Sequence, residues 1–222
     1  MKSPAARTRI SGEAGSMVVE TLTTVAVGLL ALAAFTTLHV GQMYAMRDQV
    51  RQVDLQSSAR DIADLFSREV RRAGSGTNPN CTGTASTGLL LAKANEVRIR
   101  ADLDANGALT GAQEDVTWKL DSAGSAVTRT QNNSSTTETL WSGPSLGNSR
   151  IVYFNAEGSQ LSPGGSGLSA AQLLQVVRIR IELDLKGSST QKTDTNLQVA
   201  DAAADVELRN RRFLTPANCP YL

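Results

Sequence analysis

The 222-residue chain has few of the residues and motifs on which most enzyme active sites depend. Its single histidine, His39, falls at the end of a long apolar run, which excludes a Ser-His-Asp or Cys-His arrangement in the rest of the chain. It has no phosphate-binding glycine loop of the Walker type and no dinucleotide-binding fingerprint. Glu114 and Asp115 are adjacent acids, but neighbours on a strand point to opposite faces. We therefore expect a protein that is not an enzyme and requires no cofactor.

The chain also lacks an excess of either charge sign. It contains 22 basic and 21 acidic residues, and the part after residue 15 contains 19 and 20. A protein held to nucleic acid by general phosphate attraction carries a basic excess. We therefore expect no direct nucleic-acid partner.

One apolar run is long enough to cross a membrane. Residues 21–40 contain no Asp, Glu, Lys or Arg, and about 20 helical residues cross a hydrocarbon core roughly 30 Å thick. Three basic residues and one acid precede the run: Lys2, Arg7, Arg9 and Glu13. This basic excess predicts a cytoplasmic N-terminus. The sequence thus predicts a single pass through a membrane, with most of the chain outside the cytoplasm.

The segment between the basic residues and the apolar run, residues 15–20, reads G-S-M-V-V-E. A secretory signal has a similar layout, and residues 31–33 offer an A-x-A cleavage site. Three features disfavour that interpretation. Glu20 costs about 2–3 kcal/mol within an apolar segment on translocon scales, and the small Gly15 lies on the cytoplasmic side of the run. The helical pattern also continues well past Val40.

These six residues resemble the processing motif of type IV prepilins. In that family a dedicated prepilin peptidase cuts after the Gly, and the mature chain has Glu at its fifth position. The resemblance implies cleavage between Gly15 and Ser16, removal of a leader formed by residues 1–15, and a role in assembly for Glu20. Most members begin the mature chain with Phe where this one has Ser16, so the resemblance implies cleavage more strongly than N-methylation.

The role of Glu20 follows from the cost of burying a charge. A carboxylate in a bilayer or in the apolar core of a filament needs a positive partner. After cleavage, the amine of Ser16 on the same or a neighbouring subunit is the candidate. In the alternative, Glu20 belongs to a simple membrane anchor and extends toward the lipid headgroups.

The helical pattern extends far beyond the membrane. Apolar residues recur at steps of three and four and form one helical face: Leu55, Ala59, Ile62, Phe66, Val70 and Ala73. No proline interrupts residues 17–73, and Gly74 is a stop signal. The sequence predicts one helix of about 85 Å, with residues 16–40 in the membrane and residues 41–73 as an amphipathic continuation that packs on a sheet.

Alternating apolar and polar residues predict strands after Gly74. The predicted strands are residues 96–101, 115–120, 150–154, 176–185 and 204–209, with loops at 130–139 and 161–173. Residues 74–222 would form one β-rich extracytoplasmic domain. We predict an α+β, pilin-like fold in which the long N-terminal helix packs on an antiparallel β-sheet.

The segment 66–74, F-S-R-E-V-R-R-A-G, resembles the end of that helix in minor pilins of the PilW type and in J-type pseudopilins of type II secretion. The resemblance implies a subunit that initiates or caps assembly of a pilus or secretion pseudopilus. Its implied partners are prepilin peptidase, other minor and major pilins or pseudopilins, the inner-membrane assembly platform and the lipid bilayer. The alternative is a single-pass, membrane-anchored envelope protein with a β-rich binding domain that joins no filament.

Two further features suggest ways to stabilise the domain. Cys81 and Cys219 would form a disulfide in an oxidising compartment and close a loop worth roughly 4–5 kcal/mol on the chain-entropy estimate. The alternatives are free thiols or half of a metal site.

An acidic loop follows the first predicted strand. Asp102, Asp104 and Asn106 precede a glycine as in a calcium loop, but the twelfth position is Gln113, and Glu114 comes next. Calcium held by these three residues and Glu114 is one interpretation. The other is an Asp/Asn/Gly-rich turn that needs no metal.

Overall fold

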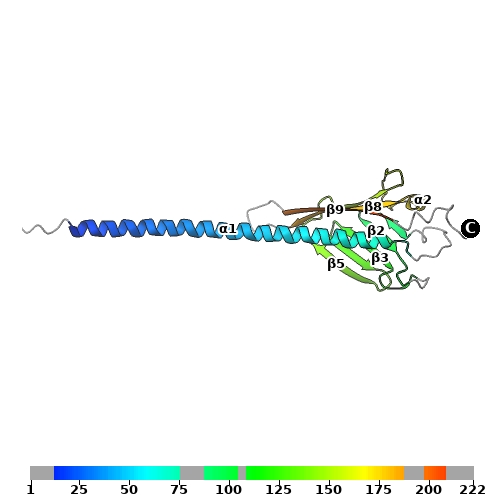
Figure 1. The fold of residues 1–222 in the computed structure, drawn as a ribbon, viewed down its shortest axis with the longest axis horizontal. Coiled ribbons are helices and arrows are strands. Elements are labelled where there is room, and N and C mark those ends of the chain that lie inside the picture. The colour runs from blue at the N-terminus through cyan, green and yellow to red at the C-terminus, as the bar shows by residue number, and fades with distance from the viewer. Residues whose placement is uncertain (1–12, 76–87, 105–108, 188–197, 209–222) are drawn as a thin grey trace, which may run out of the picture. The chain divides into compact units, whose positions relative to one another are not determined.

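The computed structural model describes residues 13–75, 88–104, 109–187 and 198–208. The chain divides into two compact units, residues 1–48 and 49–222. Helix α1 (Glu13–Arg72) contributes residues to both (Figure 1). The long N-terminal helix predicted from the sequence is therefore confirmed, and it begins at Glu13, before the predicted membrane segment.

In the first unit, every described side chain from residue 16 to residue 47 is exposed. Within the described chain, one helix is long and apolar enough to cross a membrane; its most apolar 18-residue window has a mean hydropathy of 2.0 and is 0% buried. Threonines on this helix donate their hydroxyl hydrogens to carbonyl oxygens three or four residues earlier, for example Thr24 to Glu20 at 2.8 Å and Thr37 to Ala34 at 2.8 Å. Such bonds satisfy a hydroxyl without water, as a bilayer requires.

The second unit contains two antiparallel sheets in place of the single sheet expected from the sequence. The first has the order β1-β2-β3-β4-β5, and the second has the order β7-β6-β8-β9. The strands are β1 (Leu89–Ala92), β2 (Glu96–Arg100), β3 (Asp115–Asp121), β4 (Ala126–Gln131), β5 (Thr136–Ser142), β6 (Arg150–Phe154), β7 (Gln160–Leu161), β8 (Arg178–Gly187) and β9 (Gln198–Glu207). The α+β class and the antiparallel pairing are confirmed.

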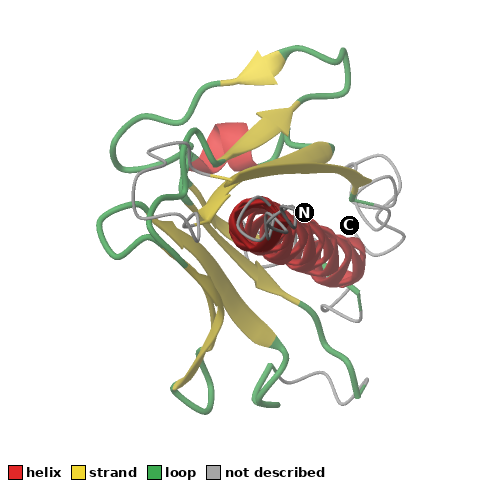
Figure 2. Ribbon diagram, turned by 90° about the vertical axis from the view of Figure 1, so that its left-hand side faces the viewer, coloured by secondary structure: helices red, strands yellow, loops and turns green. Residues whose placement is uncertain are grey.

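The second half of α1 lies between the two sheets, as the view along the helix in Figure 2 shows. All six apolar residues predicted to face a sheet are buried, and Phe66, Ala59 and Val70 are 0% exposed. The Phe66 ring packs edge-on against Trp118 of β3, with ring centroids 5.3 Å apart. Side chains of β8 alternate between buried and partly exposed, and Ile179 and Ile181 belong to the same buried hydrophobic cluster as the apolar face of α1.

The predicted loop at residues 130–139 is wrong. This tract forms the end of β4, a turn and most of β5. Thr128 pairs with Thr139 and Thr130 with Thr137, because β-branched threonine favours a strand even where both faces are polar.

The predicted loop at residues 161–173 also needs correction, because it contains the one-turn helix α2 (Ala170–Leu173). A reciprocal capping box between Ser169 and Gln172 holds this turn, and Leu173 is buried. The last strand is longer than predicted and begins at Gln198.

Candidate functional site

The processing segment lies in the first turns of α1. Gly15 and Ser16 are helical, and Ser16 and Glu20 are one helical turn apart, with exposed side chains. Within the described residues no salt bridge involves the Glu20 carboxylate. The predicted leader falls mostly outside the described residues, as do Cys81, Cys219 and Asn106.

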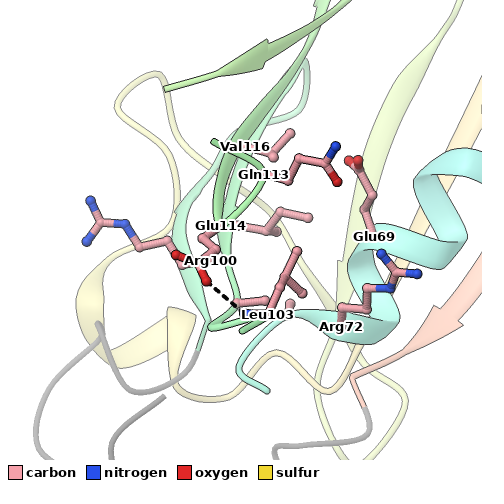
Figure 3. A pocket seen from close by; sticks show the side chains of 10 residues that line it. Glu69, Arg72, Arg100, Leu103, Gln113, Glu114 and Val116 are labelled. Atoms are coloured by element: carbon pink, nitrogen blue, oxygen red, sulfur yellow. Dashed lines mark hydrogen bonds between the residues drawn. The ribbon is translucent and has the colours of Figure 1, made fainter. Parts of the chain in front are cut away.

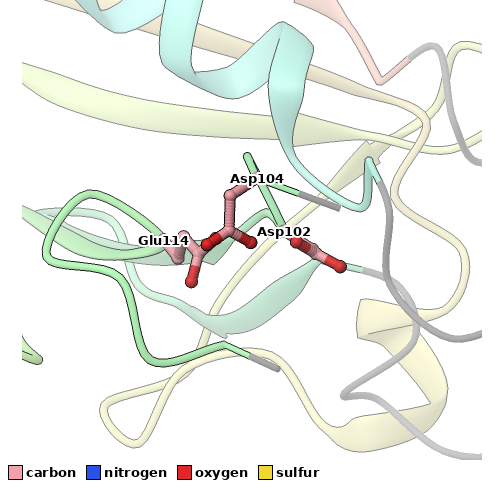
Figure 4. Close-up of side chains that lie close together, drawn as sticks. All are labelled: Asp102, Asp104 and Glu114. Atoms are coloured by element: carbon pink, nitrogen blue, oxygen red, sulfur yellow. The ribbon is translucent and has the colours of Figure 1, made fainter. Parts of the chain in front are cut away.

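The structure brings three of the predicted calcium ligands together. Carboxylate oxygens of Asp102, Asp104 and Glu114 lie within 4.8 Å of one another (Figure 4). Asp102 and Glu114 are buried, at 6% and 3% exposure, and Asp104 is exposed. Three carboxylates at such distances repel one another when ionised, and hard cations such as Ca²⁺ take ligands of this kind.

Backbone hydrogen bonds position the Glu114 carboxylate. Its Oε2 accepts a hydrogen bond from the N–H of Gly111 at 2.6 Å, and its Oε1 accepts one from the N–H of Leu103 at 2.9 Å. These bonds lower the pKa of Glu114 because they favour the charged form. A Cβ atom at Gly111 would lie 2.8 Å from the carboxylate carbon of Glu114, so a larger residue there would displace that carboxylate.

Gln113, at the position a calcium loop fills with Glu, is exposed. It lines a small crevice between the end of α1 and strands β2 and β3, and its amide points toward Glu69 (Figure 3). Glu114 therefore takes the place among the acids that strict spacing would give to residue 113.

The contact between α1 and the first sheet depends on Glu69, which the sequence analysis did not single out. Its Oε1 accepts a hydrogen bond from Nε of Arg129 at 2.7 Å, and Nη2 of Arg129 lies 2.6 Å from the same oxygen in a salt bridge. Its Oε2 accepts one from Nε1 of Trp118 at 2.5 Å. The side chains of Glu69 and Arg129 are only 13% and 7% exposed, so this is a nearly desolvated ion pair. A sequence signal was present, because Glu69 lies three residues after Phe66 on the same side of the helix.

A second buried acid lies on the opposite face of the first sheet. Asp115 of β3 accepts hydrogen bonds from Arg98 at 2.7 Å, from Arg100 at 2.6 Å and from the Asn132 amide at 2.7 Å. Burial raises the pKa of Asp115, but these bonds outweigh it and the net pKa is lowered. Glu114 and Asp115 thus have separate partners.

His39 lies on α1 in the first unit, where its ring stacks on Phe35 with centroids 6.2 Å apart and an interplanar angle of 2°.

Comparison with known proteins gives one family. The family model described as "Prepilin peptidase-dependent protein B" matches residues 48–203, which is most of the chain. No curated protein and no solved structure matches. The match starts well after the leader, so it is independent of the resemblance at residues 15–20. A pilin-like arrangement, an apolar helix long enough to anchor the chain in a membrane and this match agree, and the chain belongs to the prepilin peptidase-dependent protein B family.

Proposed function

We propose that this protein is a minor type IV pilin or pseudopilin. Prepilin peptidase cuts it between Gly15 and Ser16, and its helix holds it in the cytoplasmic membrane with the N-terminus in the cytoplasm. It then joins other pilins or pseudopilins at the assembly platform and takes part in initiating or capping a filament. Its role is structural and not enzymatic.

The observation that carries this proposal is the division of α1. The part before residue 48 exposes large apolar residues throughout, for example Leu30 at 71% and Phe35 at 67%. The part after it buries an apolar face between two sheets. A surface of the first kind is stable only in lipid or against other apolar helices. A subunit that leaves the bilayer for a filament needs such a helix in both places.

In this proposal Glu20 sets the axial position of the subunit relative to its neighbours in the filament. It lies one turn from Ser16, so the amine exposed by cleavage and the carboxylate are close enough to pair along one helix or between neighbouring helices. An unpaired carboxylate in an apolar environment costs several kcal/mol, so pairing favours one axial position of a subunit over its neighbours. The resemblance of residues 66–74 to minor types supports a minor over a major subunit.

The test is the N-terminal sequence and intact mass of the protein from membranes with and without prepilin peptidase. We expect a chain that starts at Ser16 only when the peptidase is present. Gly15→Val should block cleavage, and Gly12→Val, the same change within the leader, should not. An intact leader in both strains, or a start near Ala34, would instead support an anchored or secreted protein.

Entry into the filament is tested separately with charge-neutral variants. Glu20→Gln should be cleaved normally but should fall at least several-fold in sheared filament fractions. Glu13→Gln is the matched control, because the leader carries Glu13 away before assembly. Equal recovery of both variants would contradict the role proposed for Glu20.

A further inference from the structure

We propose that the face of the first sheet turned away from α1 binds an acidic polysaccharide. Arg98 and Arg100 hold a carboxylate of the polymer, and a row of threonines beside them binds its hydroxyl groups. The inference goes beyond the proposed function, because it gives the domain a ligand and does not depend on cleavage at Gly15 or on entry into a filament.

One buried acid holds two arginines of β2 in place. Asp115, whose side chain is 1% exposed, accepts hydrogen bonds from Nε and Nη2 of Arg98, each at 2.7 Å, and from Nε of Arg100 at 2.6 Å. The amide of Asn132 donates a further bond to the same carboxylate at 2.7 Å. The side chains of Arg98 and Arg100 are nevertheless 36% and 29% exposed. A single carboxylate therefore fixes two guanidinium groups side by side at the surface and neutralises only one of them.

The two guanidinium groups keep most of their donors for a ligand. A guanidinium has five N–H donors. Among the described contacts, Arg98 uses Nε and Nη2 and Arg100 uses Nε alone, all toward Asp115. Glu96, the next acid on this face of β2, is bonded to Lys93 at 2.9 Å and does not compete. Planar, fixed guanidinium groups with free N–H donors and one net positive charge match a carboxylate.

Hydroxyl groups continue across the sheet from this arginine pair. The strand register places Arg98 of β2 beside Thr117 of β3. It then places Thr117 beside Thr130 of β4, and Thr130 beside Thr137 of β5. Opposite residues of an antiparallel pair share a face, and the Oγ1 atoms of Thr130 and Thr137 are 3.0 Å apart. Three strand spacings of about 4.8 Å make the row roughly 14 Å long, enough for an oligosaccharide. A second row beside it consists of Lys119, Thr128 and Thr139.

The composition of this face favours a polysaccharide over other ligands. The outward side chains of β3, β4 and β5 include no aromatic residue, and Leu140 and Trp141 of β5 pack against the hydrophobic core. Single-stranded nucleic acid is bound by stacking its bases on aromatic rings, and a protein interface has an apolar and aromatic centre. Threonine hydroxyls both donate and accept hydrogen bonds, as sugar hydroxyls require. Cations and hydroxyls together therefore fit a polymer of acidic sugars.

The second sheet provides a comparison within the same molecule. The sequence V-R-I-R occurs at residues 97–100 and again at residues 177–180. Arg180 of β8 is also bonded to an acid, with its Nη2 2.6 Å from Asp205. Its cross-strand neighbours are Val152 of β6 and Asp205 of β9, so no threonine row continues from it. We therefore expect the ligand on the first sheet and not on the second.

The experiment measures binding of polygalacturonate, a polymer of an acidic sugar, to the full chain in a neutral detergent by biolayer interferometry. Dextran of the same length is the uncharged control. Calcium is left out, because a cation in the acidic loop could itself bridge the protein to a carboxylate. We expect binding of polygalacturonate that weakens as salt is added, and no binding of dextran.

Two variants test the two parts of the site. Arg100→Gln should weaken binding at least about tenfold, as expected when charge-assisted hydrogen bonds are lost. Arg180→Gln removes the same charge from the second sheet and should leave the affinity unchanged. Thr130→Val combined with Thr137→Val removes both hydroxyls and keeps the β-branched shape, so the urea midpoint should stay within error of the parent chain. This double variant should weaken binding about three- to tenfold.

Equal losses in Arg100→Gln and Arg180→Gln would indicate general charge attraction and overturn the site. Unchanged affinity in the threonine variant would overturn the polysaccharide assignment. Equal binding of dextran, no binding of polygalacturonate, or tighter binding of single-stranded DNA would overturn it as well. If Arg100→Gln also lowers the urea midpoint, the threonine variant decides, because its fold is expected to be unchanged.

Discussion

Replacing Glu69 with alanine is expected to destabilise the second unit by about 3–5 kcal/mol, which is the usual cost of leaving one member of a buried ion pair without its partner. Arg129 would lose a hydrogen bond of 2.7 Å and an ion-pair contact of 2.6 Å, while its side chain is only 7% exposed. Its other acidic neighbour, Glu138, is 3.8 Å away and 59% exposed, so it is a weak substitute. Trp118 Nε1 would also lose its acceptor.

The reasoning makes a sharper claim about the double variant. Arg129→Met removes the charge that Glu69→Ala would leave unpaired, and methionine fills most of the same space. The double variant should therefore be more stable than Glu69→Ala alone, with a coupling energy of about 2–3 kcal/mol. Asp64→Ala, an acid on the exposed side of the same helix, should change stability by no more than about 0.5 kcal/mol.

The measurement is urea unfolding of the full chain in detergent, followed by tryptophan fluorescence. With a slope of about 2 kcal/mol/M, Glu69→Ala should lower the midpoint by roughly 1.5–2.5 M. A shift no larger than that of Asp64→Ala would refute the claim that the pair is desolvated. A double variant as unstable as the sum of its two single variants would refute the claim that the unpaired arginine causes the loss.

Three further predictions concern pH, calcium and the cysteines. The pKa of Asp115 is lowered in the folded state, because hydrogen bonds such as that from Arg98 outweigh its burial. Its contribution to stability is therefore present above the unfolded pKa and is lost as pH falls through the folded pKa. Asp115→Asn should flatten the fall of the urea midpoint below about pH 4. Calcium at about 10 mM should relieve repulsion in the acidic loop and stabilise the folded domain by about 1–3 kcal/mol, as expected for an extracellular-type site. The thermal midpoint should therefore rise, and Asp104→Asn should reduce the rise. No rise in the parent chain would identify a turn without metal. Non-reducing mass mapping should find Cys81 joined to Cys219, and Cys81→Ser should lower stability by up to about 4–5 kcal/mol; two free thiols in oxidised preparations would contradict this.

The sequence predicted the helix and its buried face well because periodicity alone determines them. Six apolar residues at steps of three and four lie on one face of a helix, and all six are buried. Strands such as β2 and β8 were recognisable because each has one apolar and one polar face.

Strands without that contrast were missed. β5 has mostly exposed polar residues, and it is a strand because β4 offers a pairing partner across a short turn, which no periodicity test detects. The presence of two sheets was also not predictable, because it depends on which strands pair across α1. Glu69 and Arg129 come from elements 60 residues apart, and only the tertiary fold brings them together. For the candidate metal site, the sequence named Asp102, Asp104 and Glu114, and the structure brings their carboxylates together.

The two long faces of α1 in the second unit make opposite predictions, and this contrast tests the reasoning as a whole. Charges on the sheet side, represented by Glu69, are desolvated and paired within the chain, so their loss should lower the unfolding midpoint in isolated molecules. Charges on the opposite side of the helix, represented by Asp61, are exposed and form no salt bridge within the described residues, so reversing them should leave that midpoint unchanged. If Asp61→Arg unfolds the isolated chain, or if Glu69→Ala leaves the midpoint unchanged, then the assignment of the sheet-facing side alone to folding is wrong.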